Sequence, residues 1–152
     1  MPSLTRAEIE ALLPHREPFL FLDRILECEF GQYAIGEIDD VGQYYEHVLR
    51  GHFPAFPVLP GAIIVEALAE VGAVAALGLP ENRGKLALLT GLDGWKFRHP
   101  ARPGDRLRLE TRVLRTRGRF GTAQAVATAA EKLVASGELS FAIVDPPEAL
   151  RR

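Results

Sequence analysis

Residues 51–77 read GHFPAFPVLPGAIIVEALAEVGAVAAL, a proline-rich loop that runs directly into a long apolar segment. The three prolines of the loop stiffen the backbone and remove three N–H donors, so this loop cannot be a central strand. Residues 62–77 are apolar on nearly every side, which is typical of a buried helix. Gly78 and Pro80 then supply a stop signal. We therefore expect one long helix at the centre of the fold.

The rest of the chain has the patterns of strands, apart from a short helix near the start. Thr5 and Glu8 form a capping box, which predicts a helix that ends near Leu13. Charged side chains move from even to odd positions after Leu114, which predicts a β-bulge near Val113–Leu114. The expected strands lie within residues 19–30, 33–38, 85–97, 106–119, 123–130 and 133–144, with a short helix near 44–48. This is an α+β arrangement, an antiparallel sheet wrapped around one long central helix.

Alanine content alone would make residues 123–130 a helix. Residues 133–144, however, have the pattern of a clear strand that needs an antiparallel neighbour. We therefore predict a strand over residues 123–130.

The composition indicates one soluble domain over residues 1–152. A length of 152 residues suits a single core, and 47% hydrophobic with 25% charged residues is ordinary for a globular protein. Residues 1–13 lack an apolar signal core, and a single cysteine suits a reducing compartment, so we expect a cytoplasmic protein. The longest apolar run carries Glu66 and Glu70, whose charges argue against a membrane span.

Glu66 and Glu70 are the only charged residues of the expected central helix, and their spacing puts them on one face. Burying a carboxylate is expensive unless it is paired or its pKa rises, which makes both candidates for a functional site. A polar rim or a subunit interface is the alternative for each. His52 lies in the stiff loop, and an imidazole base with an acid kept protonated by burial is a competent acid–base pair. We take His52 and Glu66 as the catalytic pair.

Gly61 stands at the expected start of the helix, where free N–H groups stabilise developing negative charge and a glycine lets a substrate carbonyl approach closely. Other chemistries have little support. The four histidines show none of the spacings of zinc sites, and there is no G-x-S-x-G or phosphate-binding glycine motif. Cys28, on an expected strand, suits the core better than a nucleophile's role. We expect neither a metal nor a cofactor.

Several segments resemble one known family over nearly the whole chain. Residues 51–61, followed by Glu-Ala-Leu-Ala at 66–69, resemble the FabZ-type (3R)-hydroxyacyl-[acyl carrier protein] dehydratases. Residues 13–24, with Leu-Pro-His-Arg-Glu-Pro-Phe-Leu and a later Asp-Arg, resemble that family's N-terminal signature. Residues 95–105 and 138–143 resemble its later strands, in the right order.

The resemblance implies a hot-dog fold, assembled as a dimer or a trimer of dimers with active sites at the dimer interface. His52 then matches the catalytic histidine, and Glu66 the catalytic acid that the opposite subunit contributes. Gly61 matches the glycine whose N–H binds the thioester carbonyl, with Phe53 and Pro57 as further substrate contacts. The implied reaction is dehydration of a 3-hydroxyacyl chain on acyl carrier protein to the trans-2-enoyl product, in fatty acid synthesis. We expect no nucleic-acid or membrane partner.

Three positions depart from the family's pattern. Ala55 replaces a usual glycine, Glu70 a usual glutamine, and Ala130-Glu131 the usual Asp-Gly hairpin turn. These departures bear on chain-length specificity more than on the reaction. The acyl length and the choice between carrier protein and coenzyme A stay open.

Basic residues concentrate between Lys96 and Arg119, where the acidic residues are Asp105 and Glu110. This stretch is either a solvated strand face or a docking surface for an acidic carrier protein. A hot-dog thioesterase is the first alternative function, because one fold hosts several activities. A non-catalytic acyl-binding hot-dog subunit is the second, although a pure binder has no need of an acid–base pair.

Overall fold

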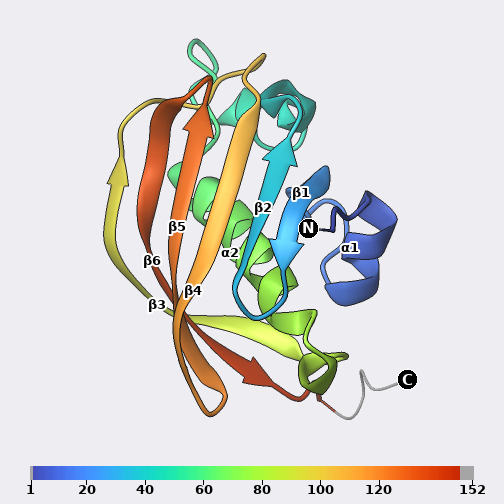
Figure 1. Ribbon diagram of the computed structural model, residues 1–152. Helices are drawn as coiled ribbons and strands as arrows, with labels where there is room; N and C mark the ends of the chain where they lie inside the picture. The colour runs from blue at the N-terminus through green and yellow to red at the C-terminus, as the bar shows by residue number, and fades with distance from the viewer. Residues whose placement is uncertain (1, 148–152) are drawn as a thin grey trace.

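The computed structural model describes residues 2–147, in which one curved sheet wraps around a central helix (Figure 1). The elements are α1 (Arg6–Leu12), β1 (Arg24–Glu29), β2 (Tyr33–Ile38), α2 (Gly61–Leu77), β3 (Leu86–Phe97), β4 (Leu107–Arg117), β5 (Phe120–Ala129) and β6 (Lys132–Val144), with 3-10 turns η1 (Val41–Tyr44), η2 (Leu49–Gly51) and η3 (Pro80–Asn82). The six strands lie in the order β1-β2-β4-β5-β6-β3, and every pair is antiparallel. The predicted α+β hot-dog arrangement is confirmed.

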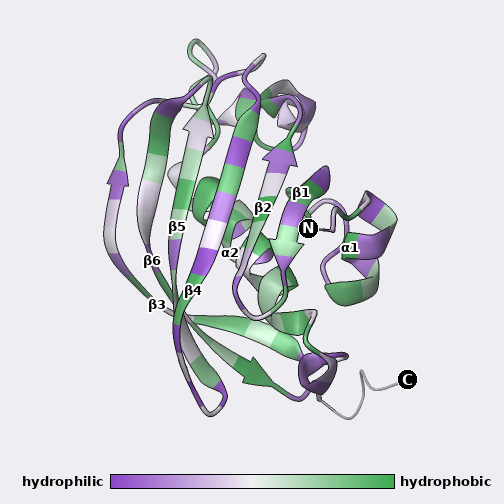
Figure 2. Cartoon of the chain, in the orientation of Figure 1, coloured by the Kyte–Doolittle hydropathy of each residue, from purple (hydrophilic) through white to green (hydrophobic). Residues whose placement is uncertain are grey.

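The helix α2 forms the centre of the core, as its apolar sequence predicted, and Figure 2 shows apolar residues along it. Strand β2 approaches it closely, since a Cβ added at Gly36 would lie 3.0 Å from Val71 Cγ2. From β4, the buried Thr111 hydroxyl donates to the Leu68 carbonyl at 2.8 Å. Among residues 2–147 no helix is long and apolar enough to cross a membrane. Because α2 packs along the sheet, its first turn is held at one end of the curved sheet.

Two strand predictions that went against simpler patterns are confirmed. Residues 120–129 form β5 despite their alanines, and Ala123, Ala125 and Ala127 are all buried. The alternation places small side chains on the face that packs towards α2. The register of β4 against β5 shifts between Val113 and Arg115, where the charge pattern predicted a bulge.

The strand expected within residues 19–30 occupies only part of that apolar stretch, because β1 begins at Arg24. Phe21 lies in the core off the sheet, and its N–H donates to the Glu70 carboxyl at 2.7 Å. This hydrogen bond uses the backbone N–H that would otherwise pair with a neighbouring strand. The expected helix at 44–48 is also wrong, because the chain makes the 3-10 turns η1 and η2 on either side. The Asp40 carboxylate accepts from the N–H of Gly42 at 2.7 Å and so starts η1.

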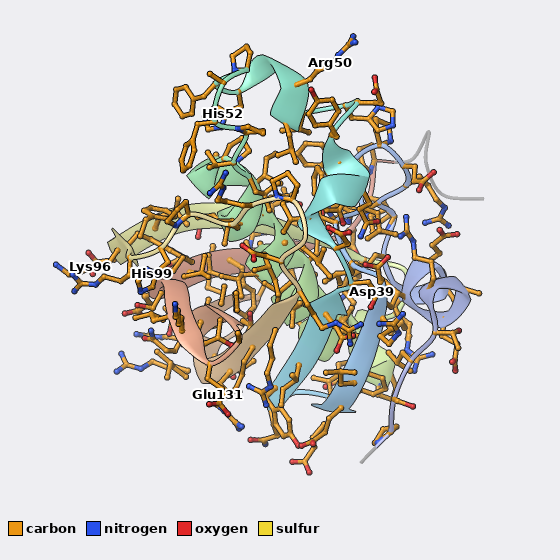
Figure 3. The ribbon with its side chains drawn as sticks, turned by 90° about the horizontal axis from the view of Figure 1, so that it is seen from above. Asp39, Arg50, His52, Lys96, His99 and Glu131 are labelled. Atoms are coloured by element: carbon orange, nitrogen blue, oxygen red, sulfur yellow. The ribbon has the colours of Figure 1, made fainter. Side chains whose placement is uncertain are left out.

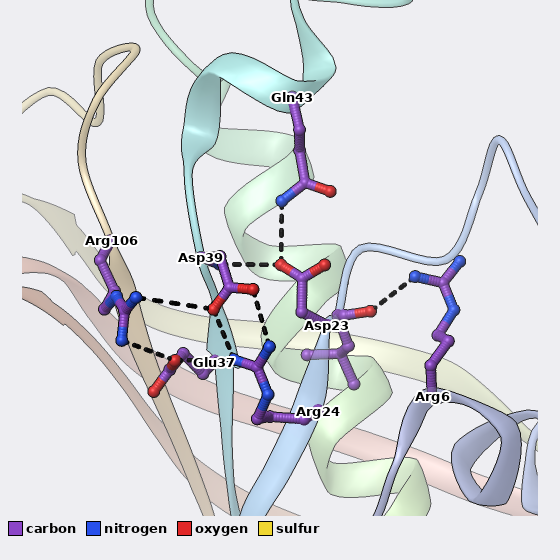
Figure 4. A network of polar contacts seen from close by, with 8 residues as sticks. Arg6, Asp23, Arg24, Glu37, Asp39, Gln43 and Arg106 are labelled. Carbon is purple, nitrogen blue, oxygen red and sulfur yellow. Dashed lines mark hydrogen bonds and ion pairs between the residues drawn. The ribbon is translucent and has the colours of Figure 1, made fainter.

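Strand β2 is buried at all its positions, and a network of ion pairs surrounds its end at Glu37 (Figure 4). Glu37 accepts from Arg24 at 2.8 Å and from Arg106 at 3.1 Å, which ties β1 and the start of β4 to β2. Asp39 binds Arg24 through both oxygens, and this arginine lowers the Asp39 pKa to about 2. The network fixes the sheet edge beside the segment that leads to the proline-rich loop.

Candidate active site

His52 lies in the loop that precedes α2, and the backbone holds its ring (Figure 3). His52 Nδ1 is 2.9 Å from the carbonyl oxygen of Val58. A carbonyl can only accept, so Nδ1 carries the proton and Nε2 keeps its lone pair in the neutral imidazole. The Leu59 N–H donates to the Ala101 carbonyl at 2.8 Å, which anchors the same loop. The ring is therefore oriented to act as a base through Nε2.

The residues after His52 form a tight turn. Phe53 has a φ of 59°, is 58% exposed, and its ring centroid lies 4.2 Å from that of His52. The Phe56 N–H donates to the Phe53 carbonyl at 2.7 Å and closes the turn. Ala55 is not in the left-handed region, so its position does not require the conformational freedom of the glycine expected there. Pro57 is half-buried where the turn meets the loop.

Gly61 is the first residue of α2, as its role at a helix N-terminus requires. Within residues 2–147 no backbone carbonyl accepts from the N–H of Gly61 or Ala62. A Cβ at position 61 would lie 2.9 Å from Phe97 Cε1, so glycine lets the ring pack against the start of α2 and a larger residue would displace it. A hollow of about 330 Å³ adjoins this point and is lined by Gly61, Phe97 and Arg98, among others. The free N–H groups at the start of α2, which is the positive end of the helix dipole, thus lie beside this hollow.

Glu66 contacts His15 rather than His52. His15 Nε2 is 3.4 Å from Glu66 Oε2, and the two side chains are 24% and 20% exposed. In the described part of the chain no hydrogen bond or ion pair joins His52 to Glu66. Burial opposes ionisation of Glu66, but the contacts with His15 and Glu70 outweigh it and lower the Glu66 pKa.

Glu70 lies one turn further along α2 and is 1% exposed. Burial, followed by the neighbouring Glu66, raises the Glu70 pKa to about 9. We expected burial to keep Glu66 protonated, yet Glu70 is the carboxyl that holds its proton at neutral pH. The difference arises because His15 faces Glu66, while Glu70 is enclosed in the core.

His15, Glu66 and Glu70 could each offer one ligand atom to a metal, since these atoms lie within 4.8 Å of one another. An ion bound there would have to displace the proton of Glu70. Sequence reasoning missed His15 as a site residue. Two signals were available, its place between two prolines in the loop after α1 and its place within the family's N-terminal signature.

The fold and these groups define a class: a hot-dog protein with an oriented imidazole, a half-buried carboxyl group and an open helix N-terminus. Residues 13–138 match the family described as the FabA-like domain. The 3-hydroxyacyl-[acyl-carrier-protein] dehydratase FabZ of Roseiflexus sp. (strain RS-1) is 55% identical over 141 residues, covering 92% of this chain and 96% of the relative. FabZ of Geobacillus thermodenitrificans is 51% identical over 140 residues, covering 92% and 95%.

A solved dehydratase heterocomplex, ApeI:P from Xenorhabdus doucetiae, has a TM-score of 0.75 over 93% of this chain and 92% of that chain. Its 16% identity makes this a likeness of fold alone. The chain belongs to the FabA-like family and, within it, to the FabZ-type 3-hydroxyacyl-[acyl-carrier-protein] dehydratases.

Proposed function

We propose that this protein removes water from (3R)-hydroxyacyl chains on acyl carrier protein, giving trans-2-enoyl thioesters in fatty acid synthesis. The orientation of His52 carries the proposal, because a fixed Nδ1–H leaves Nε2 free to take a proton. The identity to FabZ dehydratases over nine-tenths of the chain supports it.

Dehydration needs a base for the proton next to the thioester carbonyl and an acid for the leaving hydroxyl. His52 Nε2 takes the first proton, and Glu66 gives one to the 3-hydroxyl, which leaves as water. The N–H of Gly61 stabilises the enolate-like oxygen of the thioester. Phe53 and Pro57 contact the substrate beside His52.

We infer a homodimer in which His52 of one chain works with Glu66 of the other. Strand β3 ends the sheet, and its twelve residues carry four exposed apolar side chains: Leu88, Leu89, Leu92 and Phe97. A long apolar edge of this kind is a template for pairing with another chain. Antiparallel pairing of two β3 strands would continue the sheet and cover these side chains. The lack of a bond between His52 and its own Glu66 also supports a shared site. Three such dimers would make the trimer of dimers that the family resemblance implies as the alternative to a single dimer.

The docking surface for the carrier protein includes only some of the basic residues between Lys96 and Arg119. Arg106, Arg108 and Arg112 are paired with Glu37 or Glu110. Lys96, Arg98 and Arg102 are exposed and have no ion pair within residues 2–147. The Arg102 guanidinium lies 4.4 Å from the Phe56 ring centroid, which puts it against the catalytic loop. These three cations would attract an acidic carrier to the active-site entrance.

Incubation with a 3-hydroxybutyryl thioester tests the reaction. We expect enoyl absorbance to rise while free thiol stays constant. Release of thiol without enoyl product would instead identify a thioesterase. Binding of the thioester with neither product would identify a non-catalytic acyl-binding subunit.

The docking surface predicts a substrate-dependent effect of charge reversal. With a carrier-protein substrate, the double variant R98E/R102E should raise KM by roughly tenfold or more at low salt, because steering by exposed charges is lost. With a small thioester that lacks the carrier, KM should stay near the wild-type value. The matched control reverses Arg115 and Arg117, at the far end of β4. Equal effects of the two double variants would rule out docking at Arg98 and Arg102.

A further inference from the structure

The second acid of α2 has no place in the mechanism so far, yet it adjoins the proposed general acid. Glu66 and Glu70 lie one helical turn apart, and with His15 their polar atoms fall within 4.8 Å of one another. Glu66 is reached from the surface side of this cluster, where its side chain is 20% exposed. Glu70 closes the inner side.

The surroundings of Glu70 favour the protonated, neutral form of its carboxyl group. One oxygen accepts the Phe21 N–H at 2.7 Å. The other oxygen is buried and, within residues 2–147, has no hydrogen-bond partner. The described part of the chain places no cation in an ion pair with Glu70. A carboxylate buried in this way is very costly, whereas a protonated carboxyl group is not.

The groups around Glu70 leave its proton in place over the working pH range. From α1, Arg6 pairs with Glu10 and Glu17 and not with Glu70. From η1, the buried Tyr44 hydroxyl also faces this region, and burial raises its pKa, so it remains neutral. Burial first and Glu66 second raise the pKa of Glu70 to about 9. Two adjacent carboxyl groups that cannot both ionise hold one proton between them.

We propose that Glu66 and Glu70 share one proton, which rests on Glu70 and passes to Glu66 in each turnover, an inference that rests on the proposed dehydratase function. The Glu70 O–H bond breaks as its proton moves to the Glu66 carboxylate. The new Glu66 O–H bond then breaks as that proton joins the leaving hydroxyl, and the substrate C–O bond breaks to release water. Solvent returns one proton to Glu70. The proton that His52 took from carbon goes to solvent, so the cycle balances.

The pH profile of kcat tests this role. Wild-type turnover should hold until the pair loses its proton near pH 9. In Glu70→Gln the side chain has no transferable proton, and Glu66 beside His15 ionises at lower pH. We therefore expect the ratio of kcat at pH 6 to kcat at pH 8 to be roughly tenfold larger in this variant than in wild type. Glu81→Gln, an exposed change beyond the end of α2, should keep the wild-type profile. An unchanged alkaline limb in Glu70→Gln would overturn the proposal.

Two measurements without substrate separate this inference from the reaction itself. In protein with ¹³C-labelled glutamate side chains, one carboxyl should titrate near pH 9 in wild type and be missing in Glu70→Gln. Between the ordinary value of 4.5 and about 9 the folded state holds a proton that the unfolded chain releases. Wild-type stability should therefore fall with rising pH across this window, and less so in the variant. If every glutamate titrates near 4.5, the shared proton is wrong even in an active dehydratase. An alkaline carboxyl without dehydration would refute the function instead.

Discussion

At the scale of single residues, one hydrogen bond decides which atom of His52 can act. Because the Val58 carbonyl fixes the proton on Nδ1, Nε2 is the atom that would act as the base in the proposed reaction, and it would need no conformational search before each turnover. Glu66, the proposed acid, lies against His15, whose side chain is 24% exposed.

His52→Ala removes the base, and Glu66→Gln keeps the shape of the acid without its proton. Each should lower kcat at least ~10²-fold, the lower range for general acid–base catalysis. The double variant should be little worse than the worse single one, because residues that act as a unit are not additive. Steady-state kinetics with folded protein, checked by circular dichroism, measures this. Near wild-type turnover in Glu66→Gln would mean that another group is the acid.

The positions of His52 and Gly61 could be predicted from the sequence because one continuous segment sets them, with a stiff loop before a helix. The contact of His15 with Glu66 could not, since it depends on how the loop after α1 folds over α2. The sequence also did not reveal that Glu70, and not Glu66, is the carboxyl group that keeps its proton, for the same reason. Burial and neighbours of a carboxyl group are tertiary properties that helical spacing alone does not reveal.

At the scale of elements, the sequence pattern predicted the bounds of those helices and strands whose backbone hydrogen bonds are made within the helix or the sheet. Strand β2 has the predicted bounds, and α2 starts one residue earlier than the predicted residue 62. Pattern failed before β1, because a helix side chain, that of Glu70, binds the Phe21 N–H that a strand would use. The β5 strand was predictable from its need of a partner and not from its alanine content.

The turn between β5 and β6 carries conformational strain that can be relieved. Ala130 and Glu131 have φ values of 49° and 69°, in the left-handed region that favours Asn and Gly in a two-residue hairpin. Replacing them with Asn-Gly should raise the free energy of unfolding by roughly 1 kcal/mol, since the left-handed region costs other residues about that much. Urea unfolding measures the change. As a control, Gly118→Ala, at a φ of 61° in the preceding hairpin, should destabilise. A lower stability of the Asn-Gly variant would contradict the assignment of strain.

At the scale of the whole molecule, a site shared between two chains predicts complementation. An equal mixture of His52→Ala and Glu66→Gln chains, dissociated and reassociated, should regain about a quarter of wild-type activity, because half the dimers are mixed and each has one intact site of two. The control mixes His52→Ala with the double variant, which has no intact site. A mixture that stays as inactive as its components would place both groups of each site on one chain.

The exposed edge of β3 also affects the chain before it meets a partner. A newly made subunit presents the outer edge of a twelve-residue strand, whose other edge pairs with β6, beside large apolar side chains, and another strand can bind to that outer edge. If chains are made faster than they pair, more of them would bind wrong strands at this edge and misassemble. A variant chain made in excess would add to the load on chaperones and proteases. In the proposed dimer, each β3 strand would cover the exposed edge of the other, so pairing would protect both chains from misassembly.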